Sequence, residues 1–218
     1  LDKYIGDAIV AFYGAPAPVK DQEKKACSTS LEMHKRLDHL RTKWKNEGEW
    51  PDIVYNMQHR IGLNSGQMVT GNMGSEMRMN YTMMGDTVNL AARLEPAAKQ
   101  YGVYILVGEN IYEATNDEYA FRFLDFLSVK GKTIPIKAYE LIQTKESINK
   151  KSIELVDLFE KGLDNYFNQK WDDAIKLFEK SVVLEDSFKG RITNPSQVFI
   201  ERCNYLKNNP PESGWNGV

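Results

Sequence analysis

The stretch from residue 80 to residue 95 constrains the fold more than any other part of the chain; it reads NYTMMGDTVNLAARLE. A short strand pattern leads through Gly85 and Asp86 into a helical pattern. Such helix starts commonly bind phosphate, because their backbone N–H groups are not used within the helix. Asn89 and Arg93 are four residues apart, so on a helix they project from one face. The stretch therefore predicts an amide beside a permanent cation, a pair suited to a sugar and a polyphosphate.

The same stretch also admits a purely structural interpretation. An ordinary buried helix face can consist of Val88, Leu90, Ala91 and Leu94, with Arg93 as a solvated charge. For an isolated Asn-x-x-x-Arg pair this is the better interpretation, because such pairs occur in many helices that bind nothing. A functional interpretation of Asn89 and Arg93 therefore needs support from a second segment, which lies at the start of the chain.

Residues 1–13 contain two short apolar runs on either side of Gly6-Asp7. Because glycine accepts positive φ, Gly-Asp suits the tight turn of a β-hairpin, with Asp7 exposed at its tip. Taken alone, Asp7 is best interpreted as a turn-former and Lys3 as a charge on an edge strand. A carboxylate is, however, also a ligand that Mg²⁺ and Mn²⁺ prefer. The residues of this segment leave both interpretations open.

Charge and composition exclude several classes of protein. The 28 basic and 30 acidic residues give a net charge of −2, so we expect no nucleic-acid partner. Cys27 and Cys203 belong to no disulfide or zinc pattern, which suits a reducing cytoplasm. No apolar run approaches the ~20 residues of a membrane-spanning helix, so we expect no membrane contact within this sequence. Because a strand-like segment begins at Leu1, we expect a longer protein, which an upstream region could anchor to a membrane.

The remaining patterns predict a mixture of strands and helices. We expect helices at about 21–47 and 109–114, and strands at 58–64 and 103–107. The helix that carries Asn89 is expected to end near Tyr101, before Gly102. Residues 48–52 predict a turn, and His59 is interpreted as a strand residue, not a metal ligand.

Together, the two segments resemble the signatures of the class III nucleotidyl cyclases, the catalytic domain of adenylate and guanylate cyclases. The resemblance covers residues 1–143, and within it 60–66 and 69–72 resemble the β-arm next to the dimer interface. It implies a ferredoxin-like α/β (α+β) fold that here lacks its first strand and helices. It also implies a head-to-tail homodimer with sites formed across the interface.

The resemblance implies a role for each polar residue of the two segments. Asp7 resembles one of two metal-binding aspartates, which would hold Mg²⁺ or Mn²⁺. Lys3 and Thr82 resemble the adenine-selecting pair of a subgroup that carries Thr in place of the commoner second Asp. Asn89 would orient the ribose, and Arg93 would stabilise charge on the transferred phosphate. Asp7 would serve one site of the dimer, and the other four residues the second site.

Two further groups of the family's site are less well defined. The resemblance implies that the second metal-binding aspartate lies upstream of Leu1, so we expect this sequence alone to be inactive. Lys130 and Lys132 lie in a basic turn between predicted strands at 119–129 and 134–142. The resemblance makes one of them, with Lys130 favoured, a triphosphate contact. The alternative is that both are solvated charges at a hairpin tip.

Residues 144–218 form a helical extension by their pattern. Residues 162–166, 171–178 and Ser181 resemble one tetratricopeptide-type helix pair. A single pair cannot bury its apolar face, so we expect it to dock on the cyclase-like domain or on a protein partner. A third helix is expected from about 195 to 207, followed by an irregular tail from 209 onward.

The resemblance therefore implies an adenylate cyclase, which converts ATP to 3′,5′-cyclic AMP and pyrophosphate in intracellular signal transduction. ATP is favoured over GTP because Lys3 and Thr82 differ from the guanine-selecting pattern of Glu with Cys. One alternative is a catalytically silent cyclase-homology domain that dimerises and regulates. Another is that the helical extension is the working part, as an interaction module. The joint presence of Lys3, Asp7, Asn89 and Arg93 argues against a decayed site.

Overall fold

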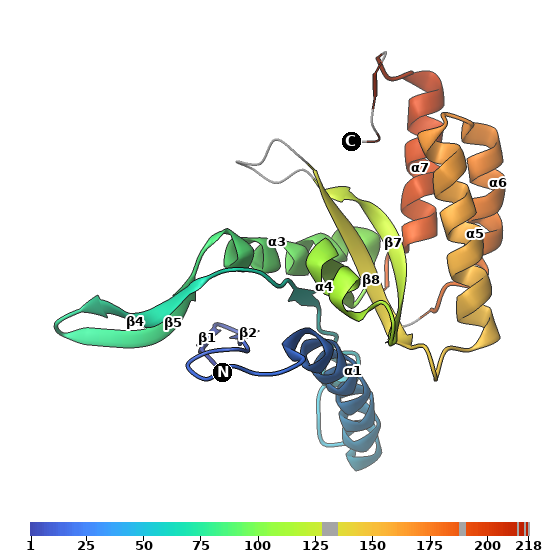
Figure 1. Cartoon of the computed structure of the whole chain (residues 1–218). Helices are drawn as coiled ribbons and strands as arrows, with labels where there is room; N and C mark the ends of the chain where they lie inside the picture. The colour runs from blue at the N-terminus through green and yellow to red at the C-terminus, as the bar shows by residue number, and fades with distance from the viewer. Residues whose placement is uncertain (128–134, 188–190, 213, 216, 218) are drawn as a thin grey trace.

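The computed structural model describes residues 1–127, 135–187, 191–212, 214, 215 and 217. Strands and helices are mixed up to residue 144, and the elements described after that residue are helices (Figure 1). The elements of the first part are β1 (Lys3–Ile5), β2 (Ala8–Val10), α1 (Gln22–Glu47), α2 (Asp52–Tyr55), β3 (Ile61–Leu63), β4 (Val69–Ser75), β5 (Arg78–Met84), α3 (Asp86–Tyr101), β6 (Ile105–Gly108), α4 (Glu109–Thr115), β7 (Tyr119–Leu127) and β8 (Ile136–Thr144). The extension contains α5 (Lys150–Phe167), α6 (Trp171–Val182) and α7 (Pro195–Asn208). The predicted α/β class is confirmed.

A four-stranded sheet, in the order β3-β6-β8-β7, forms the centre of the described structure. Strand β3 is parallel to β6, and the other neighbours are antiparallel. Ile105, Leu106 and Val107 of β6 are all buried. The strand predicted at 103–107 is thus present as β6 over Ile105–Gly108, and its residues are covered on both faces.

Helix α3 packs closely on this sheet at β3. A Cβ added to Gly62 would lie 2.4 Å from the carbonyl oxygen of Ala91 and 2.5 Å from the backbone nitrogen of Glu95. Glycine thus allows an approach between strand and helix that a larger residue would prevent. The buried residues of the helix are Leu90, Leu94, Ala98 and Tyr101. The helix ends at Tyr101, before Gly102, as expected.

Two antiparallel hairpins form separate two-stranded sheets. In the first, Ile5 pairs with Ala8 across the turn at Gly6-Asp7, which confirms the predicted hairpin. In the second, β4 pairs with β5 from Val69↔Met84 to Ser75↔Arg78. This β4–β5 arm extends away from the rest of the molecule (Figure 1).

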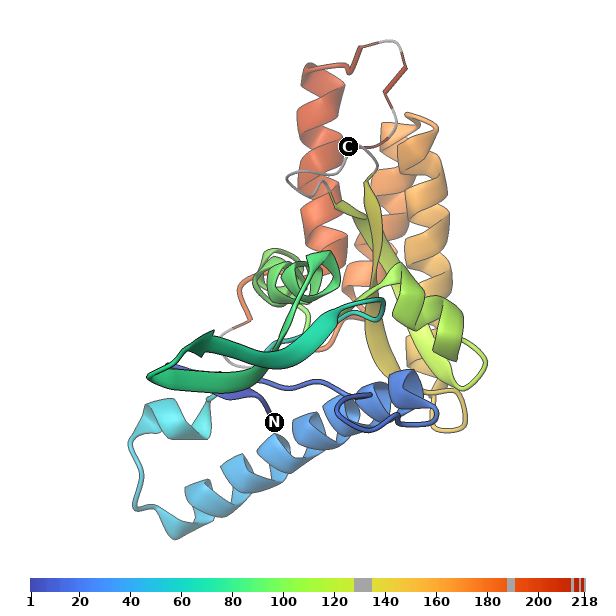
Figure 2. The same ribbon diagram turned by 60° about the vertical axis from the view of Figure 1, so that its left-hand side comes forward.

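Helix α1 agrees with the predicted helix, but the segment after it differs from expectation. The predicted turn over 48–52 is present up to Pro51, but a one-turn helix that the sequence did not predict, α2, starts at Asp52. Proline fits the start of a helix because its missing N–H would be unpaired there, and Asp52 suits the positive end of the helix dipole. Figure 2 shows that α2 and the second half of α1 project from the body of the molecule.

The helical extension packs on the central sheet and shares its core. Phe159, Phe178 and Phe199 are fully buried in the same cluster as Leu94 of α3 and Leu106 of β6. Of the two expected docking partners, the structure thus shows the cyclase-like part of the same chain. The rings of Trp215 and Tyr166 are 5.3 Å apart, so the irregular tail also contacts this core.

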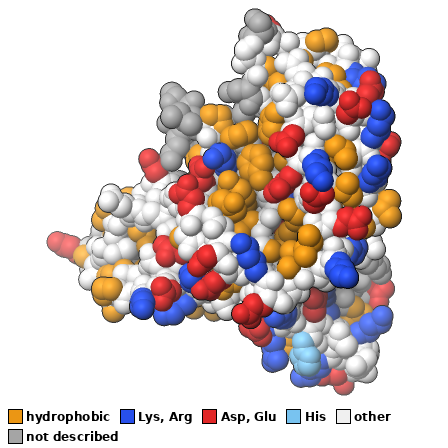
Figure 3. Space-filling model, turned by 45° about the vertical axis from the view of Figure 1, so that its right-hand side comes forward, with side chains coloured by type: hydrophobic (Ala, Val, Ile, Leu, Met, Phe, Trp, Pro, Cys, Tyr) orange, Lys and Arg blue, Asp and Glu red, His pale blue; other side chains and the backbone are white. Residues whose placement is uncertain are grey.

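Side chains of both charge signs are interspersed over the face of the molecule in Figure 3, and hydrophobic side chains gather at its centre. No single sign of charge dominates this face, as the net charge of −2 suggests. Among the described residues, none of the helices combines the length and the hydrophobicity that crossing a membrane requires.

Candidate active site

Lys3 of β1 and Thr82 of β5 form the first part of the candidate site. The Nζ atom of Lys3 donates a hydrogen bond of 2.9 Å to Oγ1 of Thr82. The two residues are 79 positions apart, so only the packing of the first hairpin against β5 brings them together. Thr82 is buried, whereas the Lys3 side chain is 42% exposed. The pair that the sequence suggested as a base-recognition site is therefore a physical contact, with an ammonium group still open to solvent.

Asp2 is a member of this cluster that the sequence analysis missed. Its Oδ2 accepts a hydrogen bond of 2.8 Å from the hydroxyl of Thr82 and lies 3.4 Å from Nζ of Lys3. Its position directly before Lys3 was the available signal. Neighbouring residues of an extended segment point to opposite faces, however, so no sequence pattern indicated that both side chains lie at Thr82.

Asn89 and Arg93 lie on successive turns of α3, as predicted, and both are exposed. Leu90 and Leu94 are buried on the other side of the helix. Within the described residues, the Asn89 side chain has no hydrogen bond or ion pair, so it can contact a ligand without breaking one. The strand that carries Thr82 leads directly into this helix, so the two groups share one short continuous support.

The turn at Gly85 fixes the start of α3. The carbonyl oxygen of Gly85 accepts hydrogen bonds from the backbone N–H groups of Val88 and Asn89, at 3.1 Å each. Asp86 occupies the first turn, where a negative charge is favourable because the helix dipole is positive at that end. This local structure sets the direction in which Asn89 and Arg93 leave the helix.

Asp7 is exposed in the turn between β1 and β2. Its carboxylate is a hard oxygen ligand of the type that Mg²⁺ prefers, and Mg²⁺ sites commonly use one or two carboxylates together with substrate phosphates. The part of the chain that the structure describes contains no group of three or more His, Cys, Asp or Glu side chains that could hold a metal by itself. Asp7 therefore suits the role of one protein ligand in a metal site whose other ligands include substrate phosphates. Lys130 and Lys132 lie outside the described residues.

His59 precedes β3 and packs beside a second histidine that is distant in sequence. The ring centroids of His34 and His59 are 5.4 Å apart, and those of His34 and Tyr104 are 4.1 Å apart. Burial, followed by the neighbouring charge of His34, lowers the pKa of His59 to about 4. The pKa of His34 is also lowered, mainly by burial. The packing among aromatic rings gives His59 a structural role.

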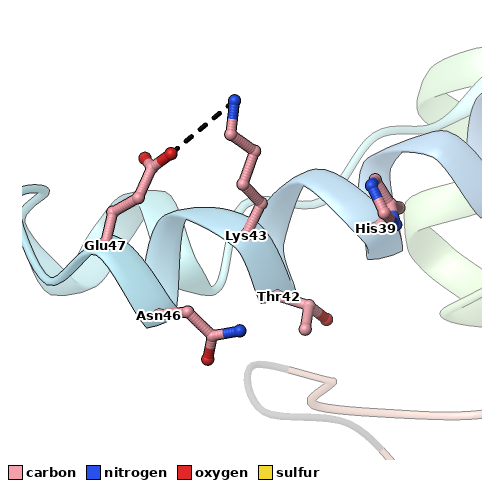
Figure 4. Close-up of a pocket in the computed structure, with 5 residues that line it drawn as sticks. All are labelled: His39, Thr42, Lys43, Asn46 and Glu47. Carbon is pink, nitrogen blue, oxygen red and sulfur yellow. Dashed lines mark ion pairs between the residues drawn. The ribbon is translucent and has the colours of Figure 1, made fainter.

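A surface pocket of about 390 Å³ lies on α1 (Figure 4). The residues that line it are His39, Thr42, Lys43, Asn46 and Glu47. Lys43 and Glu47 form an ion pair of 3.6 Å within the same helix. Among the described residues, the lining of the pocket contains none of the predicted site residues and comes from one exposed helix. We assign it no part in the candidate active site.

Comparison with known proteins identifies the family. Residues 3–143 match the model of the adenylate and guanylate cyclase catalytic domain. The match covers more than half of the chain, so the chain belongs to this family. It is 28% identical over 207 residues to the terminal-differentiation specific adenylate cyclase of Dictyostelium discoideum, covering 93% of this chain and 9% of that protein. The chain spans between about a tenth and just over a quarter of the length of three curated relatives that it matches.

Solved structures show the same fold. The adenylyl cyclase CyaB from P. aeruginosa has a TM-score of 0.58 at 29% identity, covering 68% of this chain and 74% of that chain. The guanylyl cyclase Cya2 has a TM-score of 0.54 at 28% identity, covering 68% and 72%. Because cyclases of both nucleotides resemble this chain about equally, the fold alone does not select the base.

Proposed function

We propose that this chain is the catalytic part of an adenylate cyclase that converts ATP to 3′,5′-cyclic AMP and pyrophosphate in cytoplasmic signal transduction. Family membership supports a cyclase. The observation that carries the choice of ATP is the hydrogen bond of 2.9 Å between Lys3 and Thr82. This contact provides a donor and a hydroxyl oxygen at one point, as recognition of adenine requires.

Each remaining site residue has a role that its chemistry suits. Asn89 is exposed and orients the ribose through its amide. Arg93 is on the next turn and stabilises charge on the α-phosphate while the ribose 3′-hydroxyl attacks and pyrophosphate leaves. A guanidinium suits this task because it is always charged and presents several donors in one plane. Lys130 is the proposed contact to the triphosphate.

Asp7 is the proposed metal ligand of this chain. Its carboxylate would hold Mg²⁺ or Mn²⁺, together with phosphate oxygens and a further carboxylate. The bound metal would neutralise phosphate charge and favour deprotonation of the attacking hydroxyl. The exposed position of Asp7 at a hairpin turn leaves its carboxylate accessible to such a ligand set.

We further propose that two copies of the chain form the active dimer. Several large apolar side chains of the first hairpin and the β4–β5 arm are exposed to solvent. Their exposed fractions are 67% for Tyr4, 61% for Ile5, 67% for Val69, 97% for Met77 and 60% for Met79. Exposed apolar surface of this kind marks interaction sites. The first hairpin contains Lys3 and the β4–β5 arm contains Thr82, so a second copy bound to these two elements would border the nucleotide site.

The proposed division of the chain is a cyclase portion from 1 to 143 and a helical extension from 144 to 218, which contains the tetratricopeptide-like pair. The extension also remains a candidate for binding a protein partner. A pull-down with the intact protein, and with variants that change only exposed residues of the extension, tests this. If these variants capture the same proteins as the unaltered chain, the extension is a structural part of the enzyme.

The central experiment is an assay of the protein with its complete natural sequence, supplied with Mg²⁺ or Mn²⁺ and with ATP or GTP. We expect metal-dependent cyclic AMP formation with a higher kcat/KM than cyclic GMP formation. The variant Asn89→Ala is the negative control, because it keeps the fold and removes the ribose contact. A folded, dimeric protein that forms neither product would instead support a regulatory cyclase-homology domain. A preference for GTP would contradict the roles of Lys3 and Thr82.

A further inference from the structure

Asp2, Lys3 and Thr82 form a closed triangle of polar contacts. The distances are 2.9 Å from Lys3 Nζ to Thr82 Oγ1, 2.8 Å from Thr82 Oγ1 to Asp2 Oδ2, and 3.4 Å from Asp2 Oδ2 to Lys3 Nζ. The Asp2 side chain is only 2% exposed, against 42% for that of Lys3. The carboxylate is thus covered, and it can influence a ligand only through the two groups that it touches.

The chemistry of these groups fixes the direction of each hydrogen bond. An ammonium group can only donate, an ionised carboxylate can only accept, and a hydroxyl has one proton and two lone pairs. Thr82 must therefore donate its proton to Asp2 and accept from Lys3. The Thr82 hydroxyl keeps one lone pair that can accept from a ligand, but it has no further proton to donate.

We propose that Asp2 is a positioning residue for base selection, because it holds the Thr82 hydroxyl in the role of an acceptor. This inference rests on the proposed function, in which Lys3 and Thr82 contact the purine. Adenine has an amino donor at the position where guanine has a carbonyl acceptor. The free lone pair of Thr82 accepts from the adenine amino group, whereas a guanine carbonyl would face a second acceptor. The preference for ATP then depends on a residue that does not touch the nucleotide.

The substitution Asp2→Asn tests this in the protein with its complete natural sequence. The amide of asparagine can donate to Thr82, which releases the hydroxyl proton toward the base. We expect the ratio of kcat/KM for ATP to that for GTP to fall by about tenfold, the worth of one hydrogen bond. Asp157→Asn is the matched control, because this exposed carboxylate pairs with Lys161 on the surface of α5. It is expected to leave the ratio unchanged.

A double substitution separates positioning from a general structural effect. In a Thr82→Val background, which lacks the hydroxyl, adding Asp2→Asn is expected to leave the ATP to GTP ratio unchanged. Melting curves show which variants are folded. If Asp2→Asn unfolds the protein, Asp2→Ser takes its place with the same expected fall, because a serine hydroxyl can also donate to Thr82.

Two results would overturn the inference. The first is an unchanged ratio in a folded Asp2 variant, or an equal loss of activity with both nucleotides. The second is an effect of Asp2→Asn that persists in full in the Thr82→Val background. A failure of the proposed function gives a different result, because the unaltered protein then forms no cyclic nucleotide or prefers GTP. The inference about Asp2 would fail together with that function.

Discussion

Arg122 of β7 and Glu185, which follows α6, form a buried ion pair with 2.7 Å between Nη1 and Oε1. Arg122 also pairs with Glu140 of β8, at 2.6 Å, and its guanidinium lies 4.8 Å from the centre of the Phe159 ring. Burial would raise the pKa of Glu185, but Arg122 and Arg191 hold that pKa below its ordinary value. One side chain of the central sheet thus organises the contact with the helical extension.

Replacing Arg122 is expected to destabilise the whole protein. Arg122→Ala leaves the carboxylates of Glu140 and Glu185 buried without their main partner, at a cost of about 3–5 kcal/mol in the free energy of unfolding. Urea denaturation measures this cost. Lys161→Ala is the control, because its exposed pair with Asp157 is worth at most about 1 kcal/mol. Equal stability of the two variants would show that the buried pair does not hold the extension.

A second prediction concerns Gly162 of α5. A Cβ added there would lie 2.6 Å from Cε1 of Phe178, a fully buried ring. Alanine favours a helix over glycine by about 1 kcal/mol, but overpacking a buried site costs about 1–3 kcal/mol. We therefore expect Gly162→Ala to lower the midpoint of urea unfolding. Gly71→Ala, where the added Cβ meets nothing within 4 Å, is the control. A higher midpoint for Gly162→Ala would mean that the helices separate easily.

The histidine pair predicts how stability depends on pH. The pKa of His59 is about 4 in the folded protein, against about 6.5 when unfolded. The unfolded chain therefore binds the proton first, so stability is full above pH 6.5 and falls as the pH is lowered toward 4. His59→Gln is expected to reduce this fall, measured as unfolding free energy between pH 7.5 and 5. The exposed His39 is the control site, and an equal effect of His39→Gln would contradict the assignment.

A fourth prediction tests the role of Arg93. Arg93→Ala is expected to lower the turnover of ATP by about 10²- to 10³-fold, as removal of a transition-state charge contact does. Its melting temperature is expected to change little, because Arg93 is exposed. Lys99→Ala removes an exposed cation from the same helix and is expected to keep normal turnover. Near-normal activity of Arg93→Ala would rule out the proposed role.

The sequence predicted those parts of the site that local chemistry determines. Gly6 and Gly85 mark turns that fix where β1 and α3 begin or end, so Lys3 and Asn89 could be placed on the correct elements. Asp2 could not be placed, because its partner Thr82 is 80 residues away and the contact depends on how two hairpins pack. The same limit applies to the histidine pair, since His34 meets His59 only in the folded chain.

In the helical extension, too, the sequence predicted a helix but not the contacts that it makes with the rest of the chain. Helical periodicity identified α7 closely, because an apolar face can be recognised from spacing alone. Helical spacing does not show which other element packs on this apolar face, so the sequence could not predict that contact. Trp215 contacts the core from a segment without regular structure, where no periodic pattern exists to indicate it.

The shared core determines which part of this chain can be moved intact into another protein. The family match ends at residue 143, but Leu94 and Leu106 belong to the same buried core cluster as Phe199 of α7. A chimaera cut at the family boundary would leave that apolar surface bare, and the helix bearing Asn89 and Arg93 would lose part of its foundation. The smallest part of this protein that keeps its core in a chimaera therefore extends beyond residue 143, where the family match ends.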